Sequence, residues 1–297
     1  PTCQLQYTTL PQGYKNSVSE YSKFTSYVLG NLMWQCCLTY LDDFLIWSKD
    51  FDSHLQDLDT VFCRIEQFGV QFSPSKTLFC RKELPYLGHV ITPGEGVRPN
   101  PKKIESILKL QQPKNKKDLS TFLQSVGFYR RMIPLYNKLV DPLRQLLNQS
   151  RWPQNGMTTT QKDCWEQIRT CLTKDPILAI PDLTPDANPF VLLTDACKTG
   201  IAGILMQKGA DGHLHPISYA SRITDTKERE RYHQYQLETA AIVWSMNVFK
   251  PYLRHKAVPF ILRTDCQCLL WLLTTDHDLA IKNGSSNSQN LISLSNT

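Results

Sequence analysis

The chain has 297 residues, of which 41% are hydrophobic and 20% are charged, and its net charge is +6. This is the composition of a folded protein with room for about two domains, and it excludes a disordered or low-complexity chain. The ten cysteines show no zinc spacing and no apolar run approaches the length of a membrane span, so we expect reduced thiols, an intracellular location and no membrane partner.

The first part of the chain alternates helix-like and strand-like segments. Apolar side chains recur at helical spacing in residues 17–32 and again in residues 52–68, which predicts two helices. Between them, residues 39–41 and 44–47 are rich in β-branched and aromatic side chains, which favours two strands joined by a hairpin. A strand-rich stretch follows at residues 79–91.

Two adjacent aspartates, Asp42 and Asp43, occupy the two positions between the hairpin strands. Hairpins of this length usually carry Asn-Gly or Asp-Gly, because the turn needs positive φ. A second aspartate in place of the glycine puts two like charges side by side, and a hard divalent cation such as Mg²⁺ would relieve their repulsion. The plain alternative is an exposed polar turn, which is what most isolated Asp-Asp pairs form.

Residues 100–148 have a helical and basic pattern. The cations fit a solvated helical surface, and they also fit phosphate contacts that position a nucleic-acid duplex without reading its sequence. Asp118 or Ser120 is expected to cap a helix over residues 122–132. Four side chains within residues 149–187 are expected to be buried anchors: Trp152, Trp165, Ile168 and Leu172.

The last third of the chain predicts a second group of strands. Residues 190–196, 200–206 and 215–222 favour three consecutive strands, followed by a helix over 236–249 and a fourth strand over 260–265. An acid lies on the first strand, near the start of the helix and on the last strand: Asp195, Glu238 and Asp265. Taken singly, each has an ordinary explanation as a turn residue, a helix-dipole partner or a cap.

Short motifs in a fixed order carry a family resemblance. Beside the Tyr-Leu-Asp-Asp hairpin, the chain contains LPQGYKNS at residues 10–17, SPSK at 73–76, YLGHVI at 86–91 and FYRRMIP at 128–134. Together they resemble the reverse transcriptase of gypsy-type LTR retrotransposons and related retroviruses. The likeness runs from about Leu10 to about Leu273.

The resemblance implies a role for each matching residue. Asp42 and Asp43 become catalytic metal ligands of the polymerase. The candidates near the template and the incoming nucleotide are Gln12, Gly13 and Lys76, and Lys76 could equally be a plain loop lysine. The primer-grip hairpin contains Tyr86, Leu87 and Gly88. The candidates for contact with the nucleic-acid backbone are Lys114, Lys116, Lys117, Arg130 and Arg131.

The later pattern is similar to an RNase H domain, which has three strands, a helix and a further strand with an acid on the first, fourth and fifth elements. The resemblance implies that Asp195, Glu238 and Asp265 are catalytic residues that converge on two divalent ions. In such a centre one ion activates the attacking water and the other stabilises the leaving 3′ oxygen.

The resemblance also implies an α/β fold, with an α+β palm and a helical thumb followed by an RNase H-like mixed β-sheet with helices. The expected domains are a partial palm at 1–92, a thumb at 93–148, a connection at 149–187, a C-terminally incomplete RNase H-like domain at 188–279 and a disordered or non-native tail at 280–297. Expected cofactors are two Mg²⁺ or Mn²⁺ ions per active site. Expected partners are an RNA–DNA hybrid, a primer–template duplex, deoxynucleoside triphosphates and a second polyprotein product in a dimer, in cytoplasmic virus-like particles or the nucleus.

The sequence departs from the family pattern at both acidic sites. The family has a first palm carboxylate upstream of the residues 10–17 motif and a fourth nuclease acid on a later helix, and neither has a counterpart here. Because the chain begins with Pro1, we expect a piece of a longer polyprotein or a partial gene product that extends no primer by itself. The alternatives are a catalytically inactive nucleic-acid-binding remnant and a structural subunit that assists a full-length partner.

Overall fold

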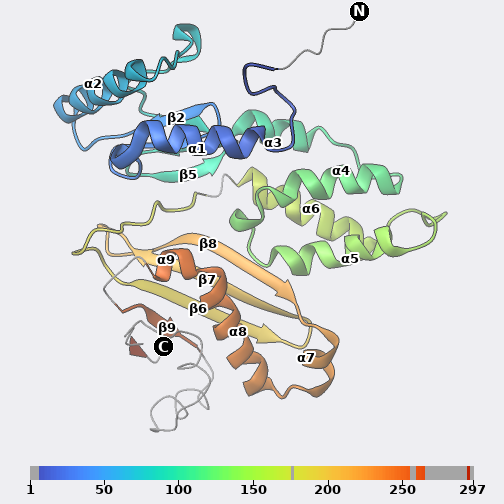
Figure 1. Ribbon diagram of the computed structural model, residues 1–297. Coiled ribbons are helices and arrows are strands. Elements are labelled where there is room, and N and C mark those ends of the chain that lie inside the picture. Colours follow the sequence, from blue (N-terminus) through green and yellow to red (C-terminus); the bar gives the residue numbers. More distant parts are fainter. Residues whose placement is uncertain (1–6, 175–176, 255–258, 265–292, 295–297) are drawn as a thin grey trace, which may run out of the picture. The chain divides into compact units, whose positions relative to one another are not determined.

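The computed structural model describes residues 7–174, 177–254, 259–264 and 293–294. It divides into two compact units, Pro1–Lys82 and Glu83–Thr297 (Figure 1). Helices and strands are mixed in both units, which confirms the predicted α/β class. In the described part of the chain, no helix combines the length and the apolar character needed to cross a lipid bilayer.

The first unit is built on two helices and one hairpin. Its elements are α1 (Ser17–Leu29), the 3-10 turn η1 (Gly30–Leu32), β1 (Cys37–Tyr40), β2 (Asp43–Ile46), α2 (Phe51–Gln67) and the 3-10 turn η2 (Pro74–Lys76). The first predicted helix ends three residues early because Gly30 has a φ of 51° and the chain tightens into η1. The buried faces of α1 and α2 meet through Val28, Leu29, Val61 and Ile65.

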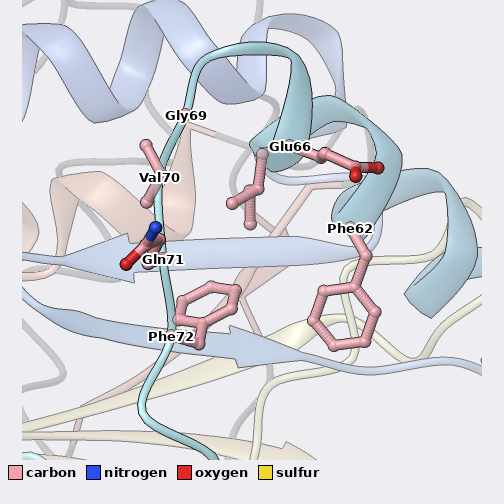
Figure 2. A pocket seen from close by; sticks show the side chains of 7 residues that line it. Phe62, Glu66, Gly69, Val70, Gln71 and Phe72 are labelled. Carbon is pink, nitrogen blue, oxygen red and sulfur yellow. The ribbon is translucent and has the colours of Figure 1, made fainter.

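Helix α2 ends where the chain reverses at Gly69, which has a φ of 66°. The returning segment and α2 border a pocket of about 340 Å³, with Phe62 and Glu66 on the helix and Val70 and Phe72 on the return (Figure 2). The Phe62 and Phe72 rings meet edge to face, with their centroids 6.0 Å apart. This aromatic contact fixes the return of the chain against the helix.

The second unit contains the remaining elements. They are β3 (Leu84–Tyr86), β4 (His89–Thr92), β5 (Gly96–Pro99), α3 (Pro101–Leu108), α4 (Lys116–Gly127), the 3-10 turn η3 (Arg130–Met132), α5 (Tyr136–Asn148), α6 (Thr159–Thr173), β6 (Phe190–Cys197), β7 (Gly200–Lys208), β8 (Leu214–Ile223), α7 (Thr226–Arg231), α8 (Gln234–Val248), α9 (Lys250–Leu253), β9 (Ile261–Arg263) and β10 (Ser293–Leu294).

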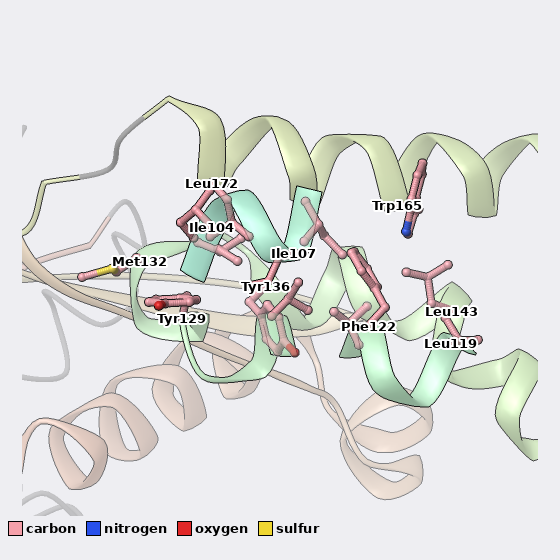
Figure 3. Close-up of a cluster of buried hydrophobic side chains, with 14 of the residues drawn as sticks. Ile104, Ile107, Leu119, Phe122, Tyr129, Met132, Tyr136, Leu143, Trp165 and Leu172 are labelled. Carbon is pink, nitrogen blue, oxygen red and sulfur yellow. The ribbon is translucent and has the colours of Figure 1, made fainter. Parts of the chain in front are cut away.

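Helices α3 to α6 share one apolar core, whose largest members include Phe122, Leu143 and Trp165 (Figure 3). The predicted burial of Trp165, Ile168 and Leu172 is confirmed, whereas Trp152 is only partly buried. The predicted cap of α4 is wrong. The helix begins at Lys116, so Asp118 and Ser120 lie inside it. The cap is Asn115, the residue before the helix, whose side chain accepts a hydrogen bond from the backbone N–H of Asp118 at 2.9 Å.

Strands β6 to β10 form a mixed sheet with the order β10-β9-β6-β7-β8. β6 pairs antiparallel with β7 and parallel with β9, and α8 lies across the same sheet (Figure 1). The predicted order of three strands, a helix and a strand is confirmed. One difference lies in the predicted disordered tail, where Ser293–Leu294 pairs with β9 as a short parallel strand.

Two direct links join the helical core to this sheet. The backbone N–H of Asn137, at the start of α5, donates to Ser221 Oγ on β8 at 3.0 Å, and the Asn137 amide donates to the Ser221 carbonyl. The second link runs through the segment after α6. Leu178 belongs to the helical core and forms a backbone bridge with Val97 on β5, with N···O distances of 2.8 and 2.9 Å, and the next residue, Ala179, donates from its N–H to the Pro216 carbonyl on β8 at 2.8 Å. The predicted thumb, connection and RNase H-like segments therefore belong to one compact unit.

Candidate active-site and nucleic-acid-binding residues

The aspartate hairpin forms, with a register that differs from the predicted one by one residue. Tyr40 pairs with Asp43, so the two connecting residues are Leu41 and Asp42, and Asp43 is the first residue of β2. Leu41 has a φ of 53°, which a residue with a Cβ adopts only under strain. Both aspartates are exposed, so the hairpin presents two neighbouring carboxylates to solvent.

The base of this hairpin is fastened to α2 by polar side chains. Ser48, which follows β2, donates from Oγ to Asp57 Oδ2 at 2.5 Å, and its Oγ lies 3.3 Å from His54 Nδ1. Both partners belong to α2. No sequence pattern reveals this network, because only the fold brings Ser48 against the helix that carries His54 and Asp57.

The other predicted polymerase residues of the first unit are exposed. Gln12 and Gly13 form a turn before α1, and Gly13 has a φ of 82°. Burial raises the pKa of the Tyr21 phenol on α1, and the negative charge of Asp42 raises it further, so Asp42 lies near α1. Lys76 ends the η2 turn as an exposed side chain.

The predicted primer-grip hairpin is the turn between β3 and β4. Leu87 and Gly88 connect Tyr86 to His89, with φ values of 46° and 79°. A Cβ on Gly88 would lie 2.9 Å from Phe128 Cε1, so this glycine permits both the turn and the approach of the Phe128 ring. The Tyr129 hydroxyl donates to the Gly88 carbonyl at 2.8 Å and holds the hairpin against the helical core.

The five predicted backbone-binding cations differ in their surroundings. Lys114, Lys117, Arg130 and Arg131 are exposed. Lys116 instead donates from Nζ to the carbonyls of Leu147, at 3.0 Å, and Gln149, at the end of α5. A cation is favourable at a helix C-terminus, so Lys116 has a structural partner that the sequence did not reveal.

Asp195 and Glu238 have contrasting environments in the RNase H-like sheet. Asp195 is exposed on β6, whereas Glu238 on α8 is only 3% exposed. Gln234, one turn earlier on α8, donates from Nε2 to Glu238 Oε1 and to the Ala196 carbonyl, each at 2.7 Å. Because Ala196 follows Asp195 on β6, Gln234 ties the helical carboxylate to the strand that carries the first acid.

The third predicted nuclease acid, Asp265, lies outside the described residues. Among the described residues, no group of three or more His, Cys, Asp or Glu side chains is placed to hold a metal ion. The donors that are described at the two acidic sites are all carboxylates, which are the ligands that hard divalent cations prefer. The donor chemistry fits Mg²⁺ or Mn²⁺, with two carboxylates described at each site.

Two family models match the chain. A model for reverse transcriptase (RNA-dependent DNA polymerase) matches residues 3–91, and a model for an RNase H-like domain found in reverse transcriptase matches residues 157–262. The retrovirus-related Pol polyprotein from transposon 297 of Drosophila melanogaster is 32% identical over 271 residues, which is 90% of this chain and 24% of that protein. The transposon Tf2-3 polyprotein of Schizosaccharomyces pombe is 28% identical over 279 residues, covering 94% of this chain and 20% of that protein.

Solved structures support the fold. A foamy viral protease-reverse transcriptase in complex with dsDNA matches with a TM-score of 0.76 and 19% identity, over 98% of this chain and 60% of that chain. The same viral protein in complex with an RNA/DNA hybrid matches with a TM-score of 0.75 and 21% identity, over 98% and 39%. The chain spans about a quarter or less of the length of the curated relatives named above. By its two domains and these relatives, the chain belongs to the reverse transcriptase and RNase H family found in the Pol polyproteins of gypsy-type LTR retrotransposons.

Proposed function

We propose that this chain supplies a reverse-transcribing polyprotein with part of its polymerase centre and with a nuclease centre that cuts RNA–DNA hybrids. Asp42 and Asp43 serve as polymerase metal ligands, and Asp195, Glu238 and Asp265 serve as nuclease ligands. Bound Mg²⁺ or Mn²⁺ supplies an activated nucleophile and neutralises charge at the phosphate. The substrates are a primer–template duplex, an RNA–DNA hybrid and deoxynucleoside triphosphates.

The buried carboxylate of Glu238 carries the nuclease proposal. Gln234 holds one oxygen of the Glu238 carboxylate and also donates to the Ala196 carbonyl, so this buried acid has a fixed place beside β6. The neighbouring Asp195 is open to solvent and to a substrate. An oriented acid on the helix, held beside the strand that carries an exposed acid, supports a metal-dependent nuclease site.

The remaining roles follow the same assignment. Gln12, Gly13 and Lys76 face the template and nucleotide, and the Tyr86, Leu87 and Gly88 hairpin supports the primer. Exposed cations contact the nucleic-acid backbone: Lys114, Lys117, Arg130 and Arg131. We retain the predicted domains as part of this proposal. The two compact units divide after Lys82, ten residues before the proposed palm–thumb boundary at residue 92.

A labelled RNA–DNA hybrid incubated with the full chain tests the nuclease proposal. We expect Mn²⁺- or Mg²⁺-dependent cleavage, reduced about tenfold or more by Asp195→Asn and by Glu238→Gln, because each change removes a charged metal ligand. Asp211→Asn, an exposed aspartate of the β7–β8 turn, is the matched control. Binding of the hybrid that is equal in EDTA and in Mg²⁺, without cleavage, would instead support an inactive nucleic-acid-binding protein.

Replacing Gln234 with Leu is expected to weaken Mn²⁺ binding about tenfold, which is the usual cost of removing a residue that orients a metal ligand. The Leu side chain keeps the bulk but cannot donate to Glu238 or to the Ala196 carbonyl. Gln236→Leu is the control, because Gln236 belongs to the same helical turn and accepts from the His233 N–H instead. Titration of Mn²⁺ by electron paramagnetic resonance measures the affinity, and equal affinities for the two variants would exclude this role of Gln234.

A further inference from the structure

A cavity of about 530 Å³ lies within the second unit, away from the predicted acidic sites. It is bordered by the β4 strand, by the segment that connects α4 to η3, by residues 178–181 and by α9. Its volume lies within the range of about 300–1,000 Å³ that is usual for small-ligand sites. No role predicted from the sequence requires a cavity here.

Aromatic side chains form one wall of this cavity. The His89 and Phe128 rings are stacked, with centroids 5.1 Å apart and an angle of 30° between their planes, and Tyr129 meets Phe128 edge to face at 4.9 Å. Phe128 is nevertheless 55% exposed, so much of its ring remains uncovered. Tyr252 of α9 also lines the cavity. An aromatic ring that is held rigidly and left partly open is a surface on which another planar ring can stack.

Two cations border the same cavity. Arg130 and Arg131 both line it, and both are exposed. Neither forms an ion pair in the part of the chain that the structure describes, where the arginines with a carboxylate partner are Arg98, Arg169 and Arg222. Burial lowers the pKa of the His89 imidazole, and the positive charge of Arg131 acts in the same direction, against a hydrogen bond with the Leu87 carbonyl. The arginines are therefore the cations on which a phosphate site here depends.

We infer that this cavity binds one nucleoside monophosphate unit, free or within a single strand, with its base on Phe128 and its phosphate at Arg130 and Arg131. Bases of any sequence stack on aromatic side chains, and guanidinium groups are well suited to phosphate. The apolar wall formed by Val97, Leu178 and Ile217 excludes water from the base. This inference extends the proposed nucleic-acid binding to a site for an unpaired nucleotide.

Isothermal titration of the full chain with AMP, adenosine, ribose 5-phosphate and inorganic phosphate tests the chemistry. We expect AMP to bind about tenfold or more tightly than either adenosine or ribose 5-phosphate, since each of those lacks one of the two contacts. Phe128→Leu and Arg131→Gln should each weaken AMP binding about tenfold. The matched controls are Phe79→Leu and Lys162→Gln, which should leave the affinity for AMP unchanged. Phe79 is 52% exposed, similar to Phe128, and Lys162 is an exposed cation.

A single-stranded oligonucleotide that carries one 2-aminopurine distinguishes a strand from a free nucleotide. Quenching of its fluorescence by the wild-type chain, lost in Phe128→Leu, identifies the strand as a ligand, whereas AMP binding without quenching identifies the free nucleotide. The inference fails if neither response depends on Phe128 and Arg131. Hybrid cleavage measured on the same samples separates the two proposals, because it depends on Asp195 and Glu238 and not on this cavity.

Discussion

Replacing Gly96 with Ala is expected to lower the free energy of unfolding of the second unit by about 3 kcal/mol, near the upper end of what single substitutions usually cost. Gly96 opens β5 with a φ of 137°, a conformation that residues with a Cβ rarely adopt. An added Cβ would lie 2.3 Å from the Leu178 carbonyl oxygen, which is far inside contact distance. The strand would have to move away, and the backbone bridge between Val97 and Leu178 would break.

Gly94→Ala is the matched control for this substitution. Gly94 also has a positive φ, 81°, but nothing lies within 4 Å of the position of its Cβ. The Gly94→Ala variant should therefore lose only about 1 kcal/mol of the free energy of unfolding, which is the cost of holding an alanine at positive φ. Urea denaturation followed by circular dichroism measures both variants, and equal losses would show that the approach of Leu178 contributes nothing to stability.

Replacing Glu228 with Ala should cost about 3 kcal/mol, because it leaves a largely covered arginine without its partner. Glu228 is 7% exposed and accepts two hydrogen bonds from Arg222, at 2.6 and 2.5 Å. It also accepts from the Asp225 N–H at 2.9 Å and thereby closes the cap of α7. Glu230→Ala, an exposed glutamate of the same helix, should change the free energy of unfolding by less than about 0.5 kcal/mol.

The same ion pair predicts a pH dependence of stability. The hydrogen bonds from Arg222 hold the pKa of Glu228 below its usual value of 4.5, against the opposing effect of burial. A lowered folded-state pKa stabilises the fold above the unfolded-state pKa, and this stability is lost as the pH falls through the folded-state pKa. Unfolding measured from pH 7 to pH 3 should show this loss in the wild type and a flatter profile in Glu228→Gln. Identical profiles would contradict it.

Local patterns were sufficient to predict most of the elements. The helical spacing of Leu237, Ala241 and Trp244 predicted α8, and the β-rich run ending at Asp195 predicted β6, because each signal lies within a single element. Strand β5 was not predicted, since it begins with Gly96 and ends with Pro99, two residues that usually interrupt strands. Its hydrogen bonds come from β4 and from Leu178, which no local pattern reveals.

The candidate site was only partly predictable for the same reason. The acids Asp42 and Asp43 were identified from their neighbours, but the hairpin register depends on a positive φ at Leu41, which its side chain gives no reason to expect. Gln234 was not predicted because its role depends on its hydrogen bond to the Ala196 carbonyl on β6. Strands β7 and β8 separate the two residues in the sequence. Long-range contacts such as these exist only once the chain has folded.

The parallel pairing of β6 with β9 has a consequence for the order in which the sheet assembles. β7 is next to β6 in the sequence and can pair with it through a tight turn as soon as both leave the ribosome. β9 follows only after β8, α7, α8 and α9 have been synthesised. Until then, the apolar edge formed by Val191, Leu192 and Leu193 stays open, which makes the nascent domain prone to intermolecular strand pairing. Chains that stop before β9 should accordingly aggregate during synthesis.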